Sequence, residues 1–162
     1  MPKLIIIRGN SGSGKTTVAK ELQKRLGHGT MLISQDAVRR EMIYVKDEQG
    51  NKAVDLLQNL VAFAREHCDN AILEGILSFD KYEKLFTQIS EIYSDIHAYY
   101  YDICFEETIR RHSKKPNAGD FGEKEMRRWW KEKDLLPTIP EKILTESMSM
   151  EYIVDMILND VL

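Results

Sequence analysis

The segment Gly9 to Thr16, GNSGSGKT, has residue types and a spacing that suit the binding of phosphate groups. Its glycines let the backbone curl around a phosphate with N–H groups pointing inward, in conformations that a side chain would obstruct. Lys15 is placed to reach the β- and γ-phosphates of a nucleotide, and the Thr16 hydroxyl is placed to ligate Mg²⁺. The following helix adds its positive dipole end. We therefore expect nucleotide contacts from Gly9, Asn10, Ser11, Gly12, Ser13, Gly14, Lys15, Thr16 and Thr17.

Asp36 is a candidate for proton transfer because it lies just beyond the apolar run Met31 to Ile33. If that run is a strand, Asp36 lies at its carboxyl end, where open α/β sheets bind their ligands. A carboxylate there can orient an acceptor hydroxyl and take its proton during phosphoryl transfer. Arg39, one helical turn further, is suited to hold an anionic part of the acceptor. The alternative is that Asp36 caps a helix and that Arg39 is a solvated charge.

Glu74 follows the apolar run Ala71 to Leu73 and precedes Gly75, which places it at the mouth of a strand beside the phosphate loop. The carboxylate is suited to hold the water shell of the metal or to contact the acceptor. An acid at this position is more often Asp, so a structural hydrogen bond is the alternative.

Four arginines lie between Phe105 and Pro137, as the adjacent pairs Arg110-Arg111 and Arg127-Arg128. Phosphoryl transfer benefits from cations over the transferring γ-phosphate. Adjacent side chains on a helix diverge by about 100°, so one member of each pair is expected to face the site. Which member does so stays open, and Arg111 and Arg127 are our candidates for catalysis. The alternative is a solvated helix with glutamate partners. The following pair, Trp129-Trp130, is expected to give at least one packing residue.

Apolar runs without alternation predict strands buried on both faces, separated by amphipathic helices. This order of elements predicts an α/β fold with a parallel sheet covered on both faces. The polar stretch Tyr44 to Lys52 is expected to be a surface loop, and residues 105–137 are expected to form a helix-loop-helix flap. The turn residues of this flap are Pro116, Asn117, Gly119 and Gly122. The expected strands are Leu4 to Ile7, Met31 to Ile33, Ala71 to Leu73, His97 to Tyr101 and Lys142 to Leu144.

The chain has 162 residues and a net charge of −3, so we expect one domain over 1–162 and no general affinity for nucleic acid or a membrane surface. The opening apolar run is too short for a signal segment or a membrane span. Cys68 and Cys104 have no metal-binding spacing, which favours a reducing compartment. We expect a cytoplasmic location.

The phosphate loop, the segment Ser34 to Arg40 (SQDAVRR), the triplet Leu73-Glu74-Gly75 and the flap together resemble the small P-loop kinases. The similarity is strongest to the group of polynucleotide 5'-hydroxyl kinases, gluconate kinases and zeta-type toxins. It implies a three-layer α/β/α P-loop NTPase fold with a five-stranded parallel sheet in the order 2-3-1-4-5. It also implies ATP and Mg²⁺ at Lys15 and Thr16, Asp36 as base or hydroxyl anchor, and a flap arginine on the transferred charge.

The expected function is an ATP-dependent phosphotransferase that acts on a hydroxyl of a small-molecule acceptor. A polynucleotide 5'-hydroxyl kinase is one alternative, although it needs a basic channel and the negative net charge gives no indication of one. A nucleotide-binding regulator without catalysis is another. A GTPase switch is excluded because no N-K-x-D motif appears; after Asn51-Lys52, Val54 stands where Asp is needed.

Overall fold

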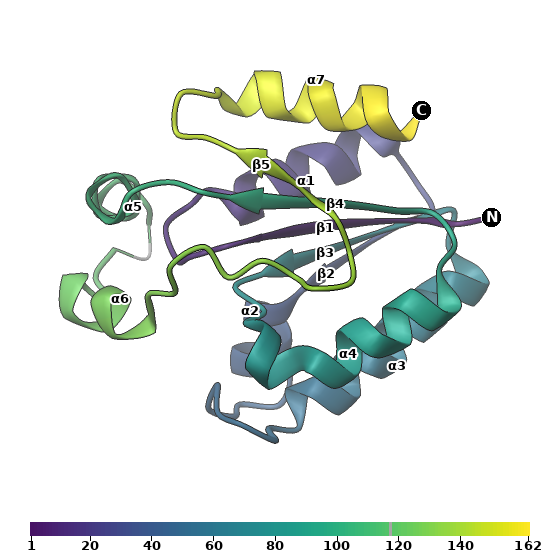
Figure 1. Cartoon of the computed structure of the whole chain (residues 1–162), viewed down its shortest axis with the longest axis horizontal. Helices are drawn as coiled ribbons and strands as arrows, with labels where there is room; N and C mark the ends of the chain where they lie inside the picture. Colours follow the sequence, from purple (N-terminus) through teal and green to yellow (C-terminus); the bar gives the residue numbers. More distant parts are fainter. Residues whose placement is uncertain (117) are drawn as a thin grey trace.

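A five-stranded parallel sheet lies at the centre of the protein, in the order β2-β3-β1-β4-β5 (Figure 1). The computed structural model describes residues 1–116 and 118–162, so Asn117 of the predicted turn lies outside the described residues. The strands are β1 (Lys3–Gly9), β2 (Thr30–Ser34), β3 (Asn70–Gly75), β4 (Ile96–Tyr101) and β5 (Glu141–Leu144). The predicted fold class and strand order are confirmed.

Helices cover both faces of this sheet, with α1 and α7 on one face and α3 and α4 on the other (Figure 1). The helices α5 and α6 lie apart from these layers, beyond the carboxyl ends of the strands. In the described residues, none of the helices is both long and apolar enough to cross a membrane. The helices are α1 (Lys15–Leu26), α2 (Gln35–Ala37), the π-helical turn η1 (Val38–Met42), α3 (Ala53–His67), α4 (Phe79–Ile92), α5 (Phe105–Ser113), α6 (Glu123–Trp129) and α7 (Met150–Val161).

The central strand β1 is buried on both faces, as its unbroken apolar run predicts. Leu4 and Ile6 pack into the cluster under α3 and α4, whereas Ile5 and Ile7 pack into the cluster under α1 and α7. All four side chains are fully buried. Burial of each such side chain is worth about 1.5–3 kcal/mol, so this strand holds both helical layers on the sheet.

Arg8 continues β1 after the apolar run, and its guanidinium is completely buried. Its Nε and Nη2 donate to the carbonyl of Leu77 at 3.2 and 3.0 Å. Nη1 and Nη2 donate to the carbonyl and the carboxylate of Asp134, both at 2.7 Å. Nη1 also lies 3.0 Å from the Glu141 carboxylate. Arg8 therefore joins the strand before the phosphate loop to the chain that returns from the flap.

We predict that Arg8→Met destabilises the fold by about 3–5 kcal/mol, because it leaves the buried Glu141 carboxylate without its cation. Urea unfolding measures this loss. The control is Arg25→Met, which removes surface ion pairs with Glu21 and Asp155 and should change the midpoint little. Equal midpoints for the two variants would contradict the structural role of Arg8.

Candidate phosphate-binding and acceptor site

A cleft of about 630 Å³ lies between the phosphate loop, the segment after β2 and the flap. It brings together four residues that the sequence analysis singled out as chemical groups: Lys15, Thr16, Asp36 and Glu74. Arg39 also lines it. The lining also holds charged or polar residues that were not predicted as site residues: Gln35, Arg40, Lys46, Asp47, Glu48, Lys81, His112, Lys115 and Lys131.

The phosphate loop holds its lysine in a poorly hydrated position. The Lys15 ammonium is buried and donates to the carbonyl of Asn10 at 2.9 Å. Burial lowers the pKa of Lys15 to about 8, although the nearby Glu74 carboxylate opposes this shift. An anion in the cleft would restore the stabilisation that water gives to the free ammonium.

The Thr16 hydroxyl donates to the Glu74 carboxylate at 3.0 Å, where β1 and β3 run side by side. Glu74 is 1% exposed, so this hydrogen bond fixes its orientation. Two hard oxygen ligands at the edge of the phosphate loop suit Mg²⁺, which usually keeps several waters and takes phosphate oxygens. In residues 1–116 and 118–162, no three His, Cys, Asp or Glu side chains are grouped as a protein-only metal site requires.

Asp36 lies in the cleft with two arginines around one carboxylate oxygen. Its Oδ1 is 3.2 Å from Nη2 of Arg39 and 2.9 Å from Nε of Arg40. The cap of α2 is Ser34, whose hydroxyl accepts from the Ala37 amide, so the alternative role of Asp36 as the cap is not supported. The Asp36 side chain is 59% exposed, which leaves its other oxygen accessible from the cleft.

Asn10 does not line the cleft, although we expected it among the residues that contact nucleotide. Its side-chain amide donates to the carbonyl of Lys131 at 2.7 Å and accepts from the Lys131 amide at 2.8 Å. Its backbone carbonyl orders the loop by accepting from the Ser13 hydroxyl at 2.6 Å and from Lys15. Asn10 thus connects the phosphate loop to the end of the flap.

The two flap arginines that we expected at the site, Arg111 and Arg127, do not line the cleft. Arg111 donates to the Ser13 carbonyl at 2.6 Å from outside the cleft lining. The guanidinium of Arg127 lies over the Phe105 ring at 4.2 Å, because the C-terminal part of α6 turns this side chain away from the cleft. Arg128 lines the cleft in its place.

Aromatic side chains form the flap wall of the cleft. His112 stacks on Phe121 with ring centroids 4.3 Å apart, and Trp129 meets Phe121 edge-on at 5.0 Å. The Arg40 guanidinium lies 5.4 Å from the Phe121 ring and 5.9 Å from the Trp129 ring. Trp130 packs edge-on against Phe105, as expected for at least one of the tryptophans.

Residues 44–52 form the wall of the cleft opposite the flap wall, so this loop does more than connect two helices. Its Lys46, Asp47 and Glu48 line the cleft. Asp47 accepts from the Tyr82 hydroxyl at 2.7 Å, and its carbonyl accepts from Lys81 at 2.9 Å. The loop is therefore held against α4 next to the position of Asp36.

The comparisons with known proteins agree with this architecture. Residues 4–79, slightly less than half of the chain, match the family model of an AAA domain. Similar solved structures include a gluconokinase from Sinorhizobium meliloti, 13% identical with a TM-score of 0.70 over 95% of this chain and 88% of that one. APS kinase from Mycobacterium tuberculosis, solved with AMPPNP and APS, is 20% identical with a TM-score of 0.64 over 98% and 96%.

A chain of an RNA repair complex is also similar, at 20% identity and a TM-score of 0.60 over 78% of this chain and 42% of that one. No curated protein matches the sequence. The fold is that of the P-loop NTPases, and the predicted resemblance to small P-loop kinases is confirmed at the level of the fold. The similar structures carry names that give different substrates, so the fold is shared among several acceptors.

We predict that Gly12→Ala loosens the flap, because a Cβ at Gly12 would lie 2.5 Å from the Thr108 carbonyl oxygen and 2.9 Å from Met126 Cε. Gly27→Ala is the matched control. The two glycines have φ of +85° and +88°, but nothing lies within 4 Å of a Cβ at Gly27. Backbone strain of about 1–3 kcal/mol applies to both variants. Limited trypsin digestion should cut residues 105–137 faster only in Gly12→Ala, and equal rates would contradict the contact.

We predict that affinity for ATP falls as pH rises through about 8, where the buried Lys15 ammonium of the free protein loses its proton. Below this pKa the ammonium is present to bind phosphate, and above it the attraction is lost. Calorimetric titrations between about pH 7 and 9.5 measure the change, since phosphate groups with a pKa of about 6 are already ionised. Lys15→Met should bind ATP weakly at every pH. A wild-type affinity that stays level over this range would exclude Lys15 as the titrating group.

Proposed function

We propose that the protein is an ATP-dependent kinase that transfers the γ-phosphoryl group to a hydroxyl of an acceptor. The observation that carries this proposal is the presence of three chemical groups in one cleft: the Lys15 ammonium, the Thr16–Glu74 pair and the Asp36 carboxylate. A switch or a simple binding protein needs the first two but not the third. The similar structure with both AMPPNP and APS supports a fold that holds a nucleotide and a second compound together.

The proposed step forms a bond between the acceptor oxygen and the γ-phosphorus and breaks the bond from that phosphorus to the β,γ-bridging oxygen. The acceptor proton passes to the Asp36 carboxylate, and the bond electrons leave with ADP. Lys15 and the loop N–H groups stabilise the charge on the leaving phosphate. Mg²⁺, when bound beside Thr16 and Glu74, would neutralise charge on the β- and γ-oxygens.

Arg39 and Arg40 hold Asp36 on the acceptor side of the cleft. The two ion pairs orient this carboxylate, as a proton acceptor requires. In the lining of the cleft, the cationic side chains outnumber the carboxylates. Apart from Lys15, Lys115 and Glu74, the cations are Arg39, Arg40, Lys46, Lys81, Arg128 and Lys131, and the carboxylates are Asp36, Asp47 and Glu48.

This balance of charge favours an acceptor that carries a negative group of its own. A small anionic alcohol is our first candidate. The same balance, together with the aromatic wall of Phe121 and Trp129, makes a short 5'-hydroxyl oligonucleotide the second candidate.

The test is a screen with γ-labelled ATP and Mg²⁺ against neutral and anionic sugars, nucleosides, hydroxylated antibiotics and 5'-hydroxyl oligonucleotides. A labelled product that is absent with Lys15→Ala would establish a kinase and its acceptor class. Binding of ATP with no transfer to any compound would favour a nucleotide-binding regulator.

We predict that Asp36→Asn keeps ATP affinity within about threefold, because Asp36 lies on the acceptor side, but slows transfer by about 10²–10⁴-fold through loss of the proton acceptor. Steady-state transfer and calorimetry on the same preparation measure the two quantities. Asp95→Asn, a change in the connection between α4 and β4, is the control and should leave both unchanged. Full transfer by Asp36→Asn would rule out its role as base.

A further inference from the structure

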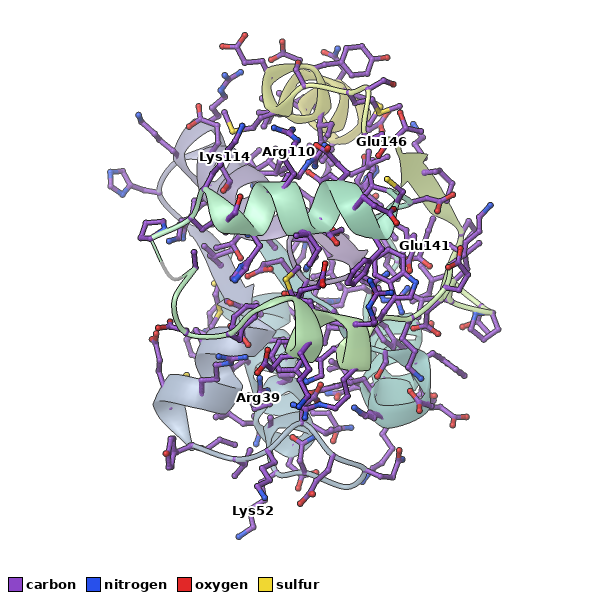
Figure 2. All side chains as sticks on the ribbon, turned by 90° about the vertical axis from the view of Figure 1, so that its left-hand side faces the viewer. Arg39, Lys52, Arg110, Lys114, Glu141 and Glu146 are labelled. Carbon is purple, nitrogen blue, oxygen red and sulfur yellow. The ribbon has the colours of Figure 1, made fainter. Side chains whose placement is uncertain are left out.

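One side of α5 faces the phosphate loop, and Lys115 lies just beyond the C-terminal end of this helix. Thr108 and His112, separated by one helical turn, are 0% and 5% exposed. The Thr108 carbonyl packs against Gly12, and Lys115, two residues beyond the end of α5, lines the cleft. Arg110 and Lys114 lie on the side of α5 toward α7 and away from α6 (Figure 2). The lysine of this helix end that reaches the cleft is therefore Lys115.

Lys115 differs from the other cations of the cleft in its surroundings. Arg39 and Arg40 pair with Asp36, and Lys81 and Lys131 lie near the carboxylates of α4 and the 44–52 loop. Lys115 is half-buried and, within the part of the chain that the structure describes, makes no side-chain hydrogen bond or ion pair. Lys46 and Arg128 also lack such partners but are exposed, so water can solvate them.

Lys115 lines the same cleft as the phosphate-loop residues Gly12 and Lys15. Burial lowers the pKa of Lys115 and the charge of Arg111 lowers it further, whereas the carboxylates of Glu74 and Asp36 oppose the shift. Repulsion by Lys115 also contributes to the lowered pKa of Lys15. Lys15 and Lys115 both line the cleft, together with the carboxylates of Glu74 and Asp36. An anion between them would convert this repulsion into two attractions.

We propose that Lys115 binds the γ-phosphoryl group from the flap side, opposite Lys15, and stabilises its charge during transfer. This inference rests on the proposed kinase function and assigns to Lys115 the role that the sequence analysis gave to Arg111 and Arg127. Arg111 donates to the Ser13 carbonyl, and the Arg127 guanidinium lies over the Phe105 ring. Neither arginine lines the cleft.

The test compares binding of ADP and AMPPNP, with Mg²⁺, to wild type, Lys115→Met and Lys114→Met. Because only AMPPNP carries a γ-phosphate, Lys115→Met should weaken AMPPNP about tenfold or more and leave the Kd of ADP within about twofold. Lys114→Met, a change of the adjacent exposed lysine, should alter neither. Lys115→Arg should restore most of the AMPPNP affinity. A merely structural role would weaken both nucleotides together.

Turnover gives the second readout. With saturating ATP, Lys115→Met should lower kcat for phosphoryl transfer, or for slow ATP hydrolysis, by about 10²–10³-fold. Equal affinities of wild type and Lys115→Met for AMPPNP, or parallel losses for ADP and AMPPNP, would overturn the inference while leaving the kinase proposal standing. Failure of the wild-type protein to bind either nucleotide would overturn both.

Discussion

The buried guanidinium of Arg8 is the interaction on which the arrangement of the cleft depends. A guanidinium removed from water needs partners for all its N–H groups, and Arg8 finds them in Leu77, Asp134 and Glu141. Asp134 also accepts from the amide of Phe79, so the same cluster fixes the start of α4. The end of β1, the exit of β3 and the return from the flap consequently meet at one charged centre directly beneath the phosphate loop.

The parts of the structure that could be predicted from sequence are those that local patterns determine. The run Leu4 to Ile7 alone indicates a strand buried on both faces, and the glycine spacing after it determines a turn that can hold phosphate. Arg8 was not recognised because a charged residue after an apolar run normally marks the end of burial. Its carboxylate partners, Asp134 and Glu141, lie 126 and 133 residues further along the chain, where no local pattern connects them with Arg8.

The orientation of the flap side chains could not be predicted, because it depends on where each helix begins. An error of one residue in the start of α6 turns every side chain by about 100°, which is the difference between Arg127 and Arg128. Lys115 was overlooked for another reason: it lies beyond the end of α5, next to Pro116, and such a position is usually read as solvated loop. The spacing from Thr108 through His112 was the signal that could have found it.

Asn10 connects the lysine of the phosphate loop with the base of the flap. The backbone carbonyl of Asn10 accepts a hydrogen bond from the Lys15 ammonium. Its side-chain amide makes two hydrogen bonds with the backbone of Lys131. In the proposed cycle, Lys15 would leave that carbonyl when it binds a phosphate, whereas the Ser13 hydroxyl and the Lys131 backbone would keep their hydrogen bonds to Asn10. Binding of the donor would then change one contact of a residue that also holds the base of the flap. Such a linkage would favour an ordered reaction, in which the donor enters before the acceptor.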